Sequence, residues 1–211
     1  ILDLLDGLIL DQGNVRIKDL DELIEYCYKV AGTVGLLMCV SLDCKEDEAK
    51  TFAIDMGIAM QLTNIIRDVL EDAKIDRRYL PSSMTNDILP KEILSIYKKK
   101  QFNTVQNQLL IKTLSKIFSI SEQYFQSGKD GLFFLPFKVR IAIAVAANIY
   151  REIGVISKQN SFRWYKKRYF TTKLQKVKIT VLTIIQETLC YKNIHPIHKK
   201  NLHTPITKLL K

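Results

Sequence analysis

The stretch Gln61-Leu-Thr-Asn64-Ile-Ile-Arg67-Asp68-Val-Leu-Glu71-Asp72 combines a helical pattern with a row of polar side chains. At about 100° per residue, Gln61, Asn64, Asp68 and Asp72 fall within roughly 80° of one another. Most of the intervening residues are apolar, which predicts a largely buried helix. Two amides and two carboxylates are therefore expected to share one stripe of that helix.

The two carboxylates of this stripe, Asp68 and Asp72, lie one helical turn apart. Like charges at this spacing destabilise a helix by a few tenths of a kcal/mol, so a compensating partner is expected. Oxygen donors one turn apart suit Mg²⁺, which keeps open positions for the oxygens of a substrate phosphate. A solvated acidic face is the simpler interpretation of an isolated pair, but the apolar surroundings favour a site for a metal ion and a diphosphate. The small residues Ala53 and Gly57, upstream on the same helix, would leave room for a ligand.

Basic residues follow closely along the chain. Arg67 precedes the first carboxylate, and Arg77, Arg78 and Tyr79 follow the helix, so that guanidinium and phenol groups are available to a polyanion. For Arg67, an ion pair with Glu71 one turn later accounts for its position equally well.

The rest of the chain has the pattern of an all-α protein, because strand and hairpin signals are nearly absent. Asp19 with Glu22 predicts the start of a helix that continues to Val40, and Asp43 is the candidate cap of a helix over 45–73. Further helices are expected over 91–97, 103–127, 136–155 and 171–190, with a loop around 79–89 and a connector at 128–131. We expect one domain over 1–190, followed by a basic, mobile tail over 191–211.

The composition is that of a globular domain with a sizeable core. The 211 residues are 47% hydrophobic and 26% charged, with only 8 Gly and 5 Pro, which excludes disordered and collagen-like proteins. The longest apolar stretch, 132–150, contains Lys138 and Arg140, so no membrane span of roughly 20 uncharged residues is predicted. The four cysteines have no CxxC spacing, which argues against a zinc site or a secreted disulfide framework.

The charge is unevenly distributed along the chain. Residues 1–90 hold 17 acidic and 9 basic residues, a net charge of −8, whereas residues 91–211 hold 5 and 23, a net charge of +18. Such asymmetry is compatible with a nucleic acid, an anionic membrane or a polyanionic substrate as partner, and also with a simple lysine-rich surface. Because the lysines are mostly isolated and lack interleaved aromatic residues, we expect no nucleic-acid binding.

Three motifs together resemble a known family. Tyr26-Cys-Tyr-Lys-Val30-Ala-Gly32-Thr-Val34-Gly35, the Gly57–Asp72 segment and Arg78-Tyr79-Leu80-Pro81 are similar to the squalene and phytoene synthase family, and most similar to its bacterial and plant phytoene synthases. Weaker similarity occurs in the expected order at 135–136, 146–150 and 167–168. The resemblance covers about residues 3–185, and its 64–72 motif is highly specific.

The resemblance implies an all-α isoprenoid synthase fold, a helical bundle around a deep apolar cavity, with Asp-rich motifs on facing helices. It also implies that two prenyl diphosphates, expected to be geranylgeranyl diphosphate, are joined head to head through a cyclopropyl diphosphate to phytoene in carotenoid biosynthesis. Mg²⁺ or Mn²⁺ would assist, and no nicotinamide would be required. Squalene or dehydrosqualene synthesis from farnesyl diphosphate is the alternative reaction.

The resemblance also suggests roles for individual residues. Asn64, Asp68 and Asp72 would bind metal or diphosphate, with Gln61 beside them. Arg67, Arg78, Tyr79 and Arg168 would serve diphosphate binding. The prenyl cavity would be lined by Tyr26, Val30, Val34, Met38, Ala53, Met56 and Tyr150, although ordinary core packing accounts for each of these singly.

One feature of the family is missing. Its first Asp-rich motif precedes the point where this chain begins, and Asp3, Asp6 and Asp11 do not reproduce it. We therefore expect that the chain lacks an N-terminal segment and does not couple two substrates by itself. A non-catalytic relative that works in binding or assembly is the competing interpretation. In either case we expect a monomer, located in the cytoplasm, in peripheral contact with membrane lipids.

Overall fold

The computed structural model describes residues 1–189 and 194–210, and in that part of the chain regular structure is helical throughout. A single parallel bridge between Arg16 and Arg78 is the sole strand-like pairing within the described ranges. The all-α prediction is therefore confirmed. The helical elements are α1 (Leu2–Leu10), α2 (Leu20–Cys27), η1 (Tyr28–Gly32), α3 (Thr33–Ser41), α4 (Glu48–Arg67), α5 (Val69–Lys74), α6 (Ser82–Thr85), α7 (Pro90–Lys98), α8 (Val105–Asp130), η2 (Gly131–Phe134), α9 (Phe137–Gln159), α10 (Lys173–Leu189) and η3 (Lys200–Ile206).

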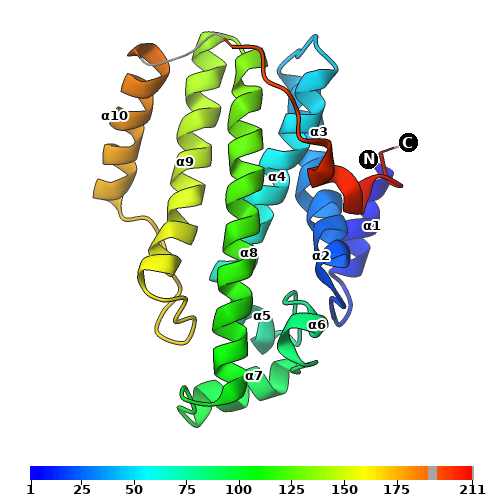
Figure 1. The fold of residues 1–211 in the computed structure, drawn as a ribbon, viewed down its shortest axis with the longest axis vertical. Helices are drawn as coiled ribbons and strands as arrows, with labels where there is room; N and C mark the ends of the chain where they lie inside the picture. The colour runs from blue at the N-terminus through cyan, green and yellow to red at the C-terminus, as the bar shows by residue number, and fades with distance from the viewer. Residues whose placement is uncertain (190–193, 211) are drawn as a thin grey trace.

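Helix α4 is the central element of the bundle. It contacts α3, η1, α8, α9 and η2, and eleven of its residues are buried. Figure 1 shows α8 and α9 side by side in front of α4, with α10 outside α9 and α1 and α2 on the opposite flank. The short helices α5, α6 and α7 close one end of the bundle. Any side chain on the inner face of α4 is thus enclosed by several neighbouring helices.

The long helix predicted from Asp19 is present as α2, η1 and α3 in continuous succession. The Asp19 carboxylate accepts a hydrogen bond from the Glu22 backbone N–H at 2.9 Å, as expected of a cap. The segment Leu20–Ser41 is the one helix in the described residues that is long and apolar enough to cross a bilayer by length and composition. Because it packs against α1 and α4, its apolarity is accounted for by the bundle core.

The close approach of this helix to α4 depends on two glycines. A Cβ atom at Gly35 would lie 2.1 Å from the Ala53 carbonyl oxygen, and one at Gly57 would lie 2.2 Å from the Ala31 carbonyl oxygen. No side chain fits such distances. Gly35 and Gly57 thus permit the close backbone approach between this helix and α4.

The helix predicted over 45–73 differs from the structure at both ends. Asp43 is not its cap, because Asp43 has a positive φ of 51° and α4 begins only at Glu48. At the other end, Asp68 departs from helical geometry (φ −105°, ψ 14°), which separates α4 from α5. The Asp72 backbone N–H still donates to the Asp68 carbonyl at 2.8 Å, so the polar stripe continues across this bend.

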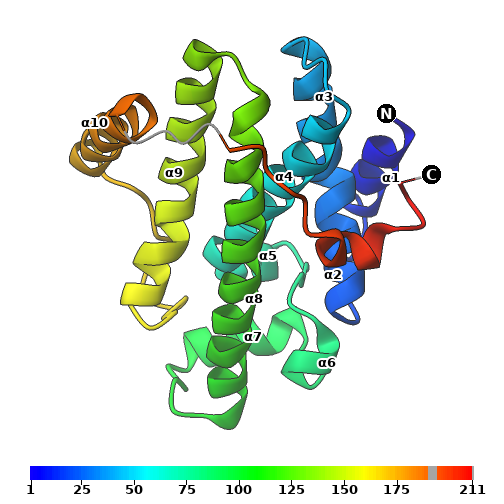
Figure 2. The same ribbon diagram turned by 45° about the horizontal axis from the view of Figure 1, so that its top comes forward.

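The prediction of a connector at 128–131 was wrong for most of its length. Residues 128–130 form the last turn of α8, because the absent Cβ of Gly128 lets α8 pack directly on Met56. The C-terminal residues 194–210 pack on the bundle, with Leu202, His203 and Ile206 buried, and the mobility expected of this tail stays a prediction. Figures 1 and 2 show this segment crossing α8 and α4 towards α2. The predicted domain boundary at 190/191 and the end of the predicted last helix at 190 lie outside the described residues.

Candidate functional site

The amide end of the polar stripe contains a buried oxygen that the protein leaves without a partner. Asn64 Nδ2 donates to Gln61 Oε1 at 3.1 Å. Asn64 Oδ1 is buried and accepts no hydrogen bond from any described residue. A buried, unsatisfied amide oxygen is costly, so this atom is available to accept a bond from a ligand. Oxygen donors of this kind are the ones that Mg²⁺ prefers.

Asp68 is held by two arginines from distant parts of the chain. Arg67 binds both carboxylate oxygens, at 2.8 Å from Nε and 2.7 Å from Nη2. Arg168 does the same from the segment between α9 and α10, at 2.6 and 3.0 Å. The alternative pairing of Arg67 with Glu71 is not formed, and Glu71 lies 3.6 Å from Lys74 instead. Two guanidinium groups therefore converge on the first carboxylate of the stripe.

These contacts determine the ionisation of Asp68. Burial alone would raise the pKa of its carboxyl, but the hydrogen bonds from Arg67 and Arg168 hold that pKa below its ordinary value. The bonds to Asp68 in turn raise the pKa of Arg67, and the Tyr150 hydroxyl contributes to the same rise. Tyr150 is thus next to Arg67 at the polar end of the site, and it is absent from the residues that line the apolar cavity described below.

Asp72 has the opposite electrostatic environment. Burial, followed by the negative charge of Asp68, raises the pKa of its carboxyl from 3.8 to about 7. Arg77 opposes this rise, whereas Glu71 and Asp11 add to it. In the described part of the chain Asp72 forms no ion pair. The second carboxylate of the stripe therefore lacks the positive partner that the first one has.

Asp11 takes part in the site, although no pattern in the sequence singled it out. It follows α1 directly, and its carboxylate accepts hydrogen bonds from Tyr79 at 2.8 Å and Tyr26 at 3.0 Å. The two tyrosine rings stack with centroids 4.9 Å apart, and Arg77 donates to the Asp11 carbonyl oxygen. Tyr26 therefore belongs to a polar cluster beside Asp72, and its expected place on the wall of the prenyl cavity is not supported. Burial raises the pKa of Tyr79 to about 12, so its hydroxyl remains a donor at neutral pH.

Arg78 has a different role from the one expected. It is 3% exposed, and its guanidinium donates to the carbonyl oxygens of Ile88 and Ile17 and to the Ser82 hydroxyl. These partners hold the loop after α5 against the segment before α2. Its assignment to diphosphate binding therefore gains no support from this geometry. The neighbouring Arg77, which faces Asp11 and Asp72, has the position that was expected of Arg78.

An apolar cavity of about 380 Å³ lies along α4. The structure brings five of the predicted wall residues together here: Val30, Val34, Met38, Ala53 and Met56. Val34 and Met38 are 43% and 41% exposed, so the cavity is open along α3. Met60 also lines it, and Asn64 follows Met60 one turn later on the same helix. One face of α4 thus passes from apolar wall to oxygen-donor stripe.

Phe170 is a further residue that the sequence did not indicate. The guanidinium carbons of Arg168 and Arg67 lie 5.1 and 5.9 Å from the centroid of its ring. Cations at this distance from an aromatic face are attracted to it. Phe170 thereby helps to orient both arginines towards Asp68.

Comparison with known proteins identifies the relatives of this chain. Residues 1–181 match the model of the squalene/phytoene synthase family. A phytoene synthase of Pseudescherichia vulneris is 34% identical over 178 residues, 83% of this chain and 55% of the relative. A 15-cis-phytoene synthase of Pantoea ananas is 33% identical over 195 residues, 92% of this chain and 61% of the relative.

Solved structures show the same fold. A crystal structure of a dehydrosqualene synthase with a bound ligand superposes with a TM-score of 0.71 at 26% identity, covering 86% of this chain and 62% of that one. The chain thus spans 55 to 61% of the length of the two curated relatives, and its helices are those of an isoprenoid synthase bundle. On the family match and the identity to these relatives, the chain belongs to the squalene/phytoene synthase family.

Proposed function

We propose that this protein joins two prenyl diphosphates head to head as a prenyltransferase. The observation that carries the proposal is the single face of α4 that leads from an apolar cavity to Asn64 and on to Asp68. A prenyl diphosphate has the same two parts, a long apolar chain and a polyanionic head. The polar end offers guanidinium groups of Arg67 and Arg168 to that head.

A divalent cation fits the same polar end. Mg²⁺, or Mn²⁺ in its place, would be held by Asn64, Asp68 and Asp72, with Gln61 supporting Asn64 through its hydrogen bond. The unpartnered oxygen of Asn64 and the carboxylate of Asp72, which lacks an ion pair within the described ranges, provide the hard donors that such an ion requires. When bound, the ion would supply charge neutralisation for the departing diphosphate.

The protein's own residues account for the remaining requirements of the reaction. Arg67 and Arg168 bind and orient the diphosphate, with Arg77 and Tyr79 at its far side, because guanidinium groups and diphosphate oxygens form charge-assisted hydrogen bonds. The apolar residues from Val30 to Met38 would pack against the prenyl chain, which would shield a cationic intermediate from water on that side of the open cavity. This chemistry transfers no hydride in a phytoene-type reaction, so no nicotinamide is required.

The substrate we favour is geranylgeranyl diphosphate, with phytoene as product in carotenoid biosynthesis. Support comes from the relatives named phytoene synthase at about one third identity. Squalene-type synthesis from farnesyl diphosphate is the alternative, since the superposing structure is a dehydrosqualene synthase. A non-catalytic binding protein of the same family is the third possibility.

One assay separates these three functions. The open reading frame that contains this chain is expressed, and the product is incubated with Mg²⁺ and radiolabelled geranylgeranyl or farnesyl diphosphate. We expect phytoene from the first substrate, and a C30 hydrocarbon from the second would support the alternative. Binding of both substrates without any coupled product would favour a binding protein and contradict our proposal. The 211-residue chain alone is expected to bind substrate weakly and to form no phytoene.

We also propose peripheral contact with an anionic membrane on the cytoplasmic side. On α10, Thr183 accepts a hydrogen bond from Asn148 of α9, and Glu187 pairs with Arg140 of α9. The polar side of α10 is therefore turned towards the bundle. The opposite side exposes apolar residues next to Lys178: Leu174, Val177, Val181, Ile185 and Leu189. An apolar face with nearby lysines is typical of interfacial helices.

Vesicle co-sedimentation tests this contact. We expect stronger binding to vesicles that contain phosphatidylserine than to neutral ones, with loss at high salt. The variant Val181→Ser with Ile185→Ser should reduce binding, whereas Lys98→Gln, a basic residue on α7, should not. Equal binding to both kinds of vesicle would contradict the proposal.

A further inference from the structure

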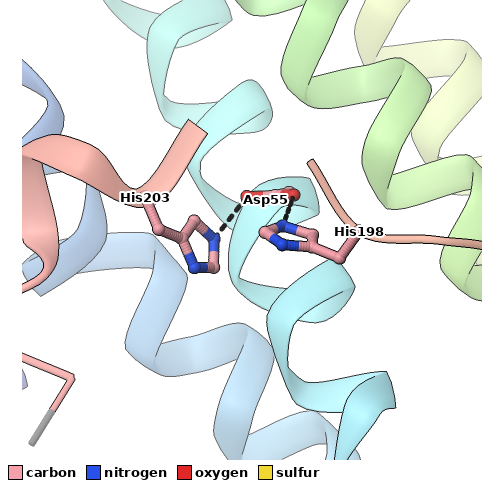
Figure 3. A group of neighbouring side chains, drawn as sticks. All are labelled: Asp55, His198 and His203. Atoms are coloured by element: carbon pink, nitrogen blue, oxygen red, sulfur yellow. Dashed lines mark hydrogen bonds and ion pairs between the residues drawn. The ribbon is translucent and has the colours of Figure 1, made fainter. Parts of the chain in front are cut away.

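All three histidines of the chain lie in its C-terminal segment, and two of them converge on one carboxylate of α4. His203 Nε2 lies 2.8 Å from Asp55 Oδ1, and His198 Nε2 lies 2.8 Å from Asp55 Oδ2. Figure 3 shows the two imidazoles approaching the carboxylate from different sides. The ligand atoms of the three residues all lie within 4.8 Å of one another. The arrangement joins residues 143 and 148 positions apart in the sequence.

The histidines are held in place by contacts that do not involve Asp55. Leu202 and Ile206 are 7% and 0% exposed. The Tyr124 hydroxyl on α8 donates to the Leu202 carbonyl oxygen at 2.6 Å. The ring of His198 packs edge-on against Phe52 at 5.2 Å between centroids. The donor atoms are therefore preorganised by packing.

The carboxylate is in an unusual electrostatic position. Asp55 is fully buried, and within the described ranges it pairs with no lysine or arginine. Apart from the two imidazoles, its partner is the Ser127 hydroxyl, which donates to Oδ2 at 2.5 Å. In the described residues, no guanidinium or ammonium group neutralises this buried negative charge. A bound cation would compensate it.

The donor set selects the kind of cation. Two imidazole nitrogens with one carboxylate form a common first shell for Zn²⁺ and related first-row ions, whereas Mg²⁺ prefers oxygen donors alone. With metal–ligand bonds of about 2.1 Å and tetrahedral angles, neighbouring ligand atoms lie about 3.4 Å apart, so the observed 2.8 Å contacts would lengthen by about 0.6 Å when the ion binds. An open groove lined by His198, His203 and Phe52 gives access from solvent and leaves room for a water ligand.

We propose that Asp55, His198 and His203 form a binding site for Zn²⁺ or a chemically similar divalent ion, which fastens the C-terminal segment to α4. This site is separate from the oxygen-donor stripe. Asp55 precedes Asn64 by nine residues, so the two point to opposite faces of α4, and it lies about 20 Å along the axis from Asp68. Because Phe52 both packs on His198 and lines the apolar cavity, the ion would also steady one wall of that cavity.

Metal titration of the untagged, chelator-treated protein tests the proposal. We expect one Zn²⁺ per chain by elemental analysis after dialysis. Co²⁺ should give the visible absorption of a four- or five-coordinate nitrogen and oxygen site. His198→Gln and His203→Gln should each weaken Zn²⁺ binding at least tenfold. His195→Gln is the matched control, because His195 is an exposed histidine of the same segment that lies opposite Glu48, outside the cluster.

Two further measurements keep the test decisive if a variant loses stability. Zn²⁺ should raise the melting temperature of the unaltered chain and protect the bonds after Lys199 and Lys200 from trypsin, and it should do neither for His203→Gln. Asp68→Asn should bind Zn²⁺ normally, which distinguishes this site from the oxygen-donor stripe. Less than 0.1 Zn²⁺ per chain in the unaltered protein, or equal binding by the His198 and His203 variants, would overturn the proposal and leave Asp55 in an ion pair with a protonated histidine.

Discussion

Arg168 and Asp68, one hundred residues apart in the sequence, form a bidentate ion pair with distances of 2.6 and 3.0 Å. Arg67 binds the same carboxylate in the same manner. The repulsion expected between Asp68 and Asp72 is thus relieved at Asp68 by two guanidinium groups when no metal is bound. An incoming diphosphate would compete with Asp68 for these groups, because both offer pairs of anionic acceptor oxygens that match a guanidinium.

This pair leads to a prediction about Arg168. Arg168→Gln should weaken binding of inorganic pyrophosphate in the presence of Mg²⁺ by about tenfold or more, since a charge-assisted bidentate donor is lost. Arg168→Lys should recover only part of the affinity, because a lysine cannot form both bonds. Isothermal titration calorimetry measures both effects. Lys167→Gln is the control for net charge, and an equal loss in that variant would mean that general electrostatic attraction accounts for the binding.

The two carboxylates of the stripe should respond in opposite directions to the same substitution. Asp68→Asn loses two charge-assisted pairs in a half-buried site and should destabilise the metal-free chain by about 1 to 3 kcal/mol. Asp72→Asn removes a buried charge without an ion pair in the described residues, so it should stabilise the metal-free chain at pH 8. Urea denaturation of both variants checks this. If both substitutions lowered, or both raised, the free energy of unfolding, our electrostatic description of the stripe would be contradicted.

The sequence predicted the stripe because its residues lie on nearly continuous helix, where a period of 3.6 fixes which side chains share a face. The same periodicity places Val30, Val34 and Met38 on one face. Their grouping with Ala53 and Met56, which lie on α4, came from the family resemblance. It failed for Tyr26 and Arg78, whose partners lie mostly in connecting segments, such as Asp11 after α1 and Ile17 before α2. Local periodicity contains no information about such partners.

The C-terminal segment shows a second limit of prediction from the sequence. Its weak periodicity and basic charge suggested a mobile tail, yet His198 and His203 meet Asp55, and Ile206 is fully buried. The signal that could have indicated this is the pairing of three histidines with an aspartate on an otherwise apolar face of α4. Likewise, Gly128 suggested a turn, whereas it permits close packing of α8 on Met56. Composition alone does not distinguish these two uses of glycine.

The packing of η1 against α4 gives a prediction about stability. Gly57→Ala would place a Cβ atom 2.2 Å from the Ala31 carbonyl oxygen, so the two helices must separate. We expect a loss of about 3 kcal/mol, at the upper end for overpacking in a core. Gly13→Ala is the matched control, because its Cβ would meet nothing closer than 3.8 Å and should change stability by less than about 0.5 kcal/mol. A similar free energy of unfolding for the two variants in urea denaturation would show that the helices do not approach this closely.

The pH dependence of metal binding should report on Asp72. Its carboxyl has a pKa of about 7 in the folded chain, against 3.8 as its ordinary value, because it is buried and lies near Asp68. The folded chain therefore holds this proton more tightly than the unfolded chain does. The stability that Asp72 contributes is fully present below about pH 4 and is lost as the pH rises through 7.

Two measurements test this loss of stability with rising pH. In the metal-free state, the stability advantage of Asp72→Asn over the unaltered chain should grow between pH 5 and pH 8, by on the order of 1 to 2 kcal/mol once solvent screening is allowed for. Mg²⁺ must displace the same proton, so calorimetry in two buffers of different ionisation enthalpy should detect release of nearly one proton per Mg²⁺ at pH 6 and almost none at pH 8.5. Asp76→Asn is the control, because Asp76 pairs with Arg16 at the surface and should leave both values unchanged. Proton release that does not vary with pH would mean that Asp72 is already ionised in the folded chain, and its proposed place in the metal site would then need another physical basis.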